Sequence, residues 1–239
     1  QFIATYGVGA EDVLVNAATG TLYTRGASCS CGHGMAAVSA ADGSSTWIAA
    51  NNTFDDITLS PDGQFVFGAD PYSRRLVVVR TSDNTVVSDV ALDGFVPHAV
   101  AAVADGRVFL AGANSAGVGI AVLSGPDHTV SSVIPLPGIV YPVDLMANAD
   151  GSRLYTIDQS YSPDVGTVAT IVMVDTESAT VTTVATNYSL GAWQGIALSP
   201  DGSLLYIPDP VAGMLHVLDS STGEQLAQIG ASKIGRAHV

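Results

Sequence analysis

The chain repeats one pattern of apolar and polar positions five times. A short apolar segment leads into a turn that ends in glycine, and three further apolar runs follow, separated by polar breaks. The turn glycines are spaced 43, 43, 45 and 51 residues apart, at Gly20, Gly63, Gly106, Gly151 and Gly202. Asp-Gly, present in four of these turns, indicates a hairpin because glycine accepts the positive φ that a tight turn needs. No stretch shows a helical period.

Each repeat therefore predicts four short antiparallel strands, the size of one blade of a β-propeller. We expect an all-β fold with about five four-stranded antiparallel blades, because a single blade buries only part of its apolar faces and must stack on neighbours. The blades are expected within residues 10–231, in units of about 10–53, 54–94, 95–138, 139–187 and 188–231. Residues 1–9 suggest the outer strand of a preceding blade, so we expect an incomplete part of a six- to eight-bladed ring.

The last residues break the pattern. Lys233 is the only lysine, and residues 234–239 resemble the translation of a sequencing adapter. We interpret residues 232–239 as a non-native tail and expect the natural protein to continue beyond them.

One repeat carries a family resemblance. Residues 198–209 (Leu-Ser-Pro-Asp-Gly-Ser-Leu-Leu-Tyr-Ile-Pro-Asp), followed by 215–223 and 225–229, resemble the YVTN family of β-propeller repeats. The family is named for a Tyr-Val-Thr-Asn stretch on the second strand, and residues 206–209, 155–158 and 67–70 occupy the positions of that stretch here. The resemblance covers residues 11 to about 229. It implies a propeller fold without one activity, since such propellers are similar to surface-layer proteins, lactonase-like enzymes and periplasmic dehydrogenase subunits.

Composition narrows the class of protein. Hydrophobic residues make up 47% of the 239 residues and charged residues 13%, which excludes a disordered chain or a coiled coil. The net charge of −14 opposes binding to nucleic acid and to anionic membranes. No apolar run approaches 18 residues, so we expect no membrane span.

Two cysteines, Cys29 and Cys31, lie in one short segment with His33. A disulfide across one residue is strained, and two thiols with one imidazole fall short of a structural zinc site. We interpret them as incidental thiols in a loop, which leaves the redox compartment open.

Composition and the family resemblance favour an exported protein, extracellular or periplasmic.

Candidate binding residues come from the start of each innermost strand. The residues eight and seven positions before each turn glycine should ring the mouth of a central channel. They give the ligand-binding candidates Asp12, Asp55, Asp56, His98, Asp144 and Gln194, with Trp193 beside the last. Carboxylates, an imidazole and an indole could hold a cation or a small polar ligand.

A structural interpretation competes with this one. Aspartates at the start of a strand commonly accept backbone N–H groups or face channel water, which would explain Asp55, Asp56 and Asp144. Asp70, Asp158 and Asp209, at the ends of second strands, are expected to cap turns by bonding the backbone close to them.

The catalytic evidence rests on His98. It follows Pro97 in a segment, residues 96–100, that looks like the first strand of lactonase-type propellers, in which a histidine near the channel helps catalysis. An imidazole titrates near neutrality and can act as a base. No arginine occupies an equivalent mouth position, and no nucleophile elbow, phosphate loop or haem site is recognisable.

Two hypotheses remain open. The favoured one is a non-catalytic, exported scaffold that binds a protein or a small polar ligand at the channel mouth and upper loops. The alternative is a lactonase-like hydrolase or a periplasmic dehydrogenase subunit with His98 in its active centre. Neither hypothesis includes a cofactor, a metal or a nucleic acid partner, and the oligomeric state stays open.

Overall fold

The described part of the chain is built entirely from β-strands and turns. The structure, a computed structural model, describes residues 12–28, 32–49, 51–162, 166–188, 195–209 and 212–230, and no helix occurs among them. The chain divides into two compact units, Gln1–Val133 and Ile134–Val239. The predicted outer strand at residues 1–9 and the tail at 232–239 lie outside the described residues.

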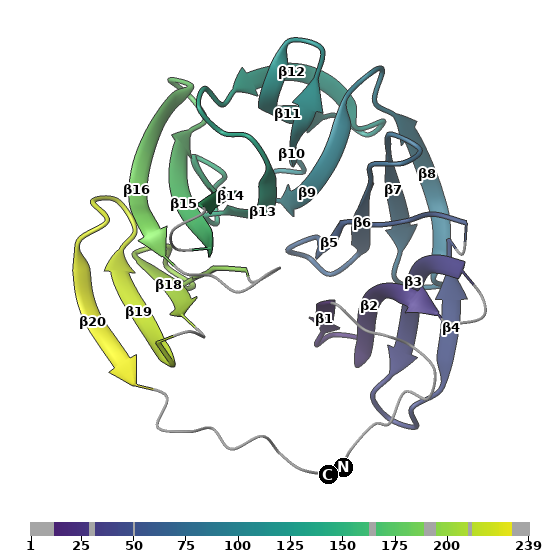
Figure 1. Cartoon of the computed structure of the whole chain (residues 1–239). Helices are drawn as coiled ribbons and strands as arrows, with labels where there is room; N and C mark the ends of the chain where they lie inside the picture. The colour runs from purple at the N-terminus through teal and green to yellow at the C-terminus, as the bar shows by residue number, and fades with distance from the viewer. Residues whose placement is uncertain are drawn as a thin grey trace. The chain divides into compact units, whose positions relative to one another are not determined.

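Unit 1 contains three four-stranded antiparallel sheets, apart from the last two residues of β12. The first comprises β1 (Asp12–Asn16), β2 (Thr21–Ser28), β3 (Gly32–Ser39) and β4 (Ser45–Ile48). The second comprises β5 (Asp56–Leu59), β6 (Phe65–Asp70), β7 (Arg75–Arg80) and β8 (Thr85–Ala91). The third comprises β9 (Val96–Ala102), β10 (Val108–Asn114), β11 (Gly117–Ser124) and β12 (Thr129–Pro135). β1 lies beside β5 and β5 beside β9, so these are the inner strands of unit 1 (Figure 1).

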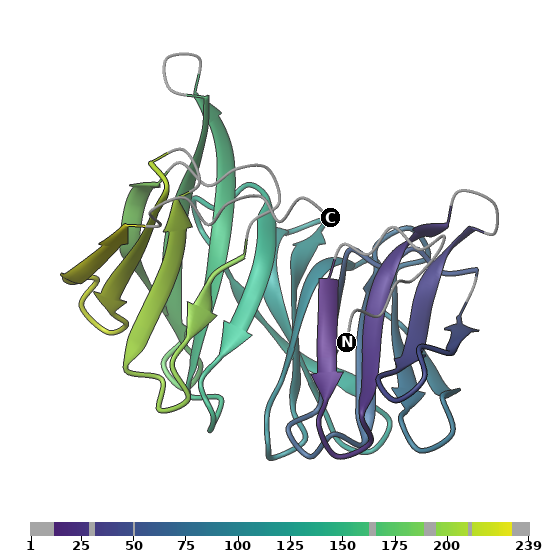
Figure 2. The same cartoon turned by 90° about the horizontal axis from the view of Figure 1, so that it is seen from below.

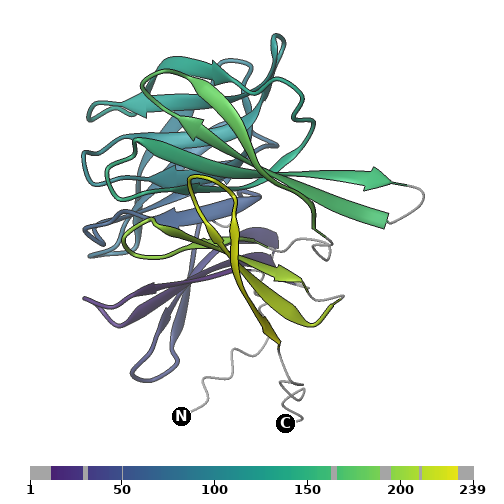
Figure 3. The same ribbon diagram turned by 90° about the vertical axis from the view of Figure 1, so that its left-hand side faces the viewer.

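Unit 2 contains two further sheets of the same order. One comprises β13 (Pro142–Ala147), β14 (Arg153–Ser162), β15 (Gly166–Asp175) and β16 (Thr180–Tyr188). The other comprises β17 (Ala197–Leu198), β18 (Leu204–Asp209), β19 (Met214–Asp219) and β20 (Gln225–Gly230). β14 and β15, with ten residues each, are the longest described strands and extend beyond their neighbours (Figure 3).

The predicted fold class is confirmed. Five sheets each join four consecutive strands in sequence order, and every strand pair is antiparallel, as Figure 2 shows for β1 to β4. This is the construction of β-propeller blades. Within the described residues, no helix of membrane-spanning length and apolar character occurs.

The Asp-Gly turns are more elaborate than the expected tight hairpin. Ser60 N–H bonds the Phe65 carbonyl at 2.8 Å, so residues 61–64 form a four-residue loop. Asp62 accepts hydrogen bonds from the Ser60 hydroxyl at 2.6 Å and from Gln64 N–H at 3.0 Å. Gly63 has a φ of 71°, the left-handed conformation that the Asp-Gly pattern predicts. The carboxylate, as much as the glycine, therefore fixes this turn.

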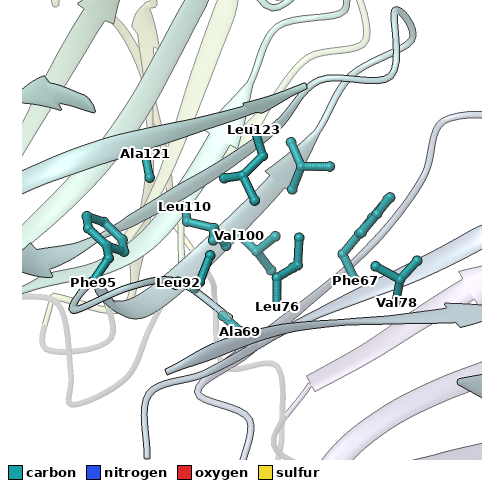
Figure 4. Packing of buried hydrophobic residues seen from close by; sticks show 11 residues of the cluster. Phe67, Ala69, Leu76, Val78, Leu92, Phe95, Val100, Leu110, Ala121 and Leu123 are labelled. Carbon is teal, nitrogen blue, oxygen red and sulfur yellow. The ribbon is translucent and has the colours of Figure 1, made fainter. Parts of the chain in front are cut away.

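Apolar side chains between neighbouring blades form the cores. In unit 1, Phe67, Leu76 and Val78 of the second blade face Val100, Leu110 and Leu123 of the third (Figure 4). A second cluster, built around Tyr23, Met35 and Val66, fills the space between the first and second blades. A third, in unit 2, joins its two blades, with Tyr155, Ile171, Leu205 and Ile207 among its members. Full burial of a side chain of this size contributes about 1.5–3 kcal/mol, so blade stacking is the main source of stability.

Candidate functional site

A histidine and a carboxylate from adjacent blades meet at the start of the inner strands of unit 1. His98 lies on β9, and Asp55 directly precedes β5. The His98 Nδ1 atom lies 2.8 Å from the Asp55 Oδ2 atom, and the two side chains are 18% and 31% exposed. Both are thus partly shielded from water and still reachable from it. A carboxylate at this distance orients the ring and fixes its tautomer, with Nδ1 as the protonated nitrogen of a neutral imidazole.

A β-bulge places His98 at this position. Ala99 pairs with Ala111 and Pro97 pairs with Gly112, so His98 is the extra residue on β9. Pro97 has no N–H to give to the ladder, and proline within a sheet is typical of bulges and edges. Gly112 is required opposite, because a Cβ there would overlap the Val96 carbonyl oxygen. The bulge turns the His98 side chain out of the regular alternation of the strand.

Arg25 brings a positive charge to the same region. It lies on β2, opposite Asp12 in the strand register, and its Nη1 atom donates to the Phe54 carbonyl at 3.3 Å. Phe54 immediately precedes Asp55. No arginine was expected at the mouth, because Arg25 belongs to a second strand. Its long side chain nevertheless reaches the segment before the inner strand of the next blade. We call Arg25, Asp55 and His98 the inner-strand site.

Two other candidate aspartates hold blades together. The Asp56 Oδ2 atom accepts the Val100 N–H of the next blade at 2.7 Å. In unit 2, Asp144 does the same toward its own neighbour: Oδ2 accepts the Ile196 N–H at 3.0 Å, and Oδ1 accepts the Leu145 N–H at 2.8 Å. These contacts match the structural interpretation that the sequence left open for Asp56 and Asp144.

Glycine is needed beside one of these contacts. A Cβ at Gly195 would lie 2.8 Å from the Asp144 Oδ2 atom. The absence of a side chain at Gly195 therefore allows the Asp144 carboxylate to approach the backbone closely.

The aspartates at the ends of second strands bind backbone, as expected. Asp70 is 2% exposed and accepts the N–H groups of Tyr72 and Ser73, each at 3.0 Å. Burial raises the pKa of Asp70, but its hydrogen bonds, foremost those from Ser73, outweigh burial and hold the pKa below its usual value. Asp209 accepts the Ala212 N–H at 2.8 Å, so both residues cap turns as predicted.

Asp158 lies inside β14, which continues to Ser162, and does not end its strand as expected. Its Oδ1 atom accepts the N–H groups of Val140 at 2.9 Å and Tyr141 at 2.8 Å, in the segment that leads into β13 of the same blade. It is 6% exposed, and this contact joins the middle of β14 to the segment before β13, as the bond from Thr53 N–H to Asp70 Oδ2 joins β6 to the segment before β5.

The remaining candidates lie outside the description. The backbone of Asp12 belongs to β1, but its side chain is not described. Trp193, Gln194, Cys29 and Cys31 lie outside the described residues altogether. Among the described side chains, no three His, Cys, Asp or Glu groups are placed to hold a metal ion.

His216, on β19, is a buried histidine of unit 2. It is 7% exposed, its Nδ1 atom lies 3.0 Å from Gln225 Oε1, and Tyr188 contacts its ring edge-on at 4.9 Å. Its Nε2 atom lies 3.7 Å from Asp209 Oδ2, which is too far for a hydrogen bond. His216 thus packs against Tyr188 and is oriented by Gln225, with the Asp209 carboxylate close to its second ring nitrogen.

Comparison of the sequence with protein-family models and with curated proteins finds no match. Solved structures do match. A putative 6-phosphogluconolactonase from Bacteroides uniformis is 17% identical with a TM-score of 0.65, covering 95% of this chain and 72% of that one.

Two further solved structures illustrate the range of similar proteins. A catalytically inactive virginiamycin B lyase from Staphylococcus aureus, solved with quinupristin, is 15% identical with a TM-score of 0.69, covering 96% of this chain and 72% of that one. A chain of a nidogen/laminin complex is 16% identical with a TM-score of 0.63, covering 91% of this chain and 78% of that one. At these identities the likeness concerns the fold alone. The chain shares the β-propeller fold with these proteins.

Proposed function

We propose that the protein is a non-catalytic binding scaffold whose inner-strand site takes a small polar ligand. The observation that carries this proposal is the 2.8 Å contact between Asp55 and His98 on adjacent blades. Together with Arg25, the site offers a carboxylate, an imidazole and a guanidinium on rigid strands. Such a set suits a ligand that carries both hydroxyl groups and a carboxylate, because each group then meets a complementary partner.

Gluconate is a suitable probe, since it combines hydroxyl groups with one carboxylate. We expect calorimetric titration to show binding, and His98→Gln and Asp55→Asn each to weaken it by about tenfold, the effect of losing a charge-assisted hydrogen bond. Asp89→Asn is the matched control: Asp89 is an exposed carboxylate of unit 1 that pairs with Arg75 at 3.1 Å. Equal affinity in all three variants, or no binding of gluconate, would contradict a polar ligand at the inner-strand site.

A hydrolase is the second candidate, favoured by the same pair. A carboxylate-oriented imidazole is a recognised general-base arrangement, and Arg25 could stabilise a developing oxyanion. The likeness to a putative 6-phosphogluconolactonase suggests lactones as test substrates. Lactone hydrolysis that disappears in His98→Ala would replace the scaffold proposal with an enzyme; gluconate binding without hydrolysis would support the scaffold.

The repeats are best assigned to the YVTN type, and we propose export to the periplasm or cell exterior. Support comes from residues 155–158 and 206–209, which occupy the second strands β14 and β18 as the repeat pattern requires. The low share of charged residues, 13%, agrees with export. The net charge of −14 argues against nucleic acid as a partner. Fractionation of cells that express the protein from its own gene would test export, and a purely cytoplasmic product would refute it.

A further inference from the structure

The end of β6 holds the segment that carries Asp55. The Asp55 N–H donates to the Ala69 carbonyl at 3.0 Å, so the residue before β5 still belongs to the ladder with β6. The Thr53 N–H donates to Asp70 Oδ2 at 3.3 Å. Phe54 therefore lies between two residues whose backbone is bonded to the last residues of β6.

The Phe54 ring lies directly on Gly68 of the same strand. Phe54 is 6% exposed, and a Cβ on Gly68 would lie 2.5 Å from both its Cδ1 and its Cε1 atoms. That is closer than side chains pack, so only glycine leaves room for the ring at this place. The ring and the two backbone bonds beside it together fix the course of the chain into β5.

Phe54 is connected to all three members of the inner-strand site. Its carbonyl oxygen accepts the Arg25 Nη1 bond at 3.3 Å. Its neighbour in sequence is Asp55, whose Oδ2 atom lies 2.8 Å from His98 Nδ1. A shift of the Phe54 ring would therefore move the acceptor of Arg25 and the partner of His98 together.

A contact of the same kind supports His98 in the third blade. Phe95, three residues before His98, is 4% exposed and belongs to the cluster drawn in Figure 4. A Cβ on Gly112 would lie 2.9 Å from the Phe95 Cε1 atom. Gly112 is also the residue opposite Pro97 at the bulge that displaces His98. The Phe95 ring and the bulge thus meet at one glycine.

Phe67 offers a comparison with these two phenylalanines. It is 4% exposed, and it packs in the cluster between the second and third blades. Its ring contacts those of Phe65 and His128, neither of which belongs to the inner-strand site. Residue type and burial are therefore the same as for Phe54 and Phe95, while the connection to the site differs.

We propose that Phe54 and Phe95 are positioning residues of the inner-strand site. Each ring lies on a glycine and fixes the backbone that carries Asp55 or His98, so the two side chains are in contact before a ligand arrives. A site that is already ordered loses less conformational entropy on binding. The inference rests on the proposed function, because it concerns how the same site is held.

The test follows the ring nitrogens of His98 by NMR in the full chain with isotope-labelled histidine, without ligand. Mildly alkaline solution is used, where an ordinary imidazole is neutral, and His98→Gln assigns the signal. We expect one tautomer, with Nδ1 protonated toward Asp55. Phe54→Leu and Phe95→Leu should each give a mixture of tautomers, because the carboxylate then no longer holds the Nδ1–H group. Phe67→Leu is the matched control and should leave the tautomer unchanged.

Titration with gluconate adds a second measurement. Phe54→Leu and Phe95→Leu should each weaken binding about tenfold, as for loss of the charge-assisted hydrogen bond itself, and Phe67→Leu should not. If gluconate does not bind the unmodified protein, the proposed function fails, but the His98 tautomer still decides the positioning role.

Three results would overturn that role. They are a mixture of His98 tautomers already present in the unmodified protein, an unchanged tautomer in folded Phe54→Leu and Phe95→Leu, and an equal change in Phe67→Leu. If one of the two variants does not fold, the other decides.

Discussion

Two adjacent aspartates have different structural roles in this protein. Asp55 and Asp56 are neighbours in sequence, yet Asp55 contacts the His98 side chain and Asp56 contacts the Val100 backbone. The alternation of side chains along an extended segment separates them to different sides, so one carboxylate can face a ligand while the other joins blades. Residue type alone could not have divided these roles.

Buried tyrosine hydroxyls also differ by their surroundings. Tyr23→Phe removes the 2.7 Å bond to Asn84, and we expect it to lower the free energy of unfolding by about 1 kcal/mol. Tyr155→Phe is the control, because the Tyr155 hydroxyl is buried with no hydrogen-bond partner among the described residues. Its loss should leave stability unchanged or improve it. Urea unfolding followed by circular dichroism measures both, and equal losses would refute the argument.

At the scale of strands, the sequence predicted most of what is observed. Turn glycines and apolar runs located the four strands of each blade, because both signals are local. The bulge at His98 escaped prediction, since it depends on the fit of Gly112 against Val96 across two strands. Arg25 escaped for the same reason: its reach to Phe54 is a contact between blades. Spacing placed Asp55 and His98 in one region, but only the fold could show that they touch.

Gly112→Ala tests the close packing at the bulge. The added methyl group would overlap the Val96 carbonyl oxygen, so we expect a loss of about 1–3 kcal/mol in unfolding free energy, as for an overpacked core. Gly230→Ala, at the end of β20, is the matched control: nothing lies within 4 Å of its Cβ position, and little change is expected. Equal stability of the two variants in urea unfolding would contradict the close contact between Gly112 and Val96 at the bulge.

At the scale of the whole molecule, an excess of aspartate is concentrated in turns. The chain carries a net charge of −14, and turn carboxylates recur in both units. The Ser221 hydroxyl, followed by the Thr222 N–H, lowers the pKa of Asp219 to about 2. The Ser199 hydroxyl does the same for Asp201, also to about 2. These turns therefore depend on ionised carboxylates.

The sign of the pH dependence follows. A carboxyl group with a lowered pKa in the folded state stabilises the fold above its unfolded value, near 3.9, and that contribution is lost as pH falls toward about 2. We expect the melting temperature to fall between about pH 4 and pH 2. Thermal melts across this range measure it, and Asp219→Asn should show a shallower decline. A melting temperature that rises on acidification would mean that relief of charge repulsion dominates.

Two backbone N–H groups report on the contact between neighbouring blades: that of Val100, bonded to Asp56, and that of Ile196, bonded to Asp144. Each amide proton is held by a neighbouring blade, so its exchange with deuterated solvent requires the blades to part locally. Exchange rates at these two amides would thus report, separately for each unit, how often adjacent blades come apart while their own hairpins stay closed.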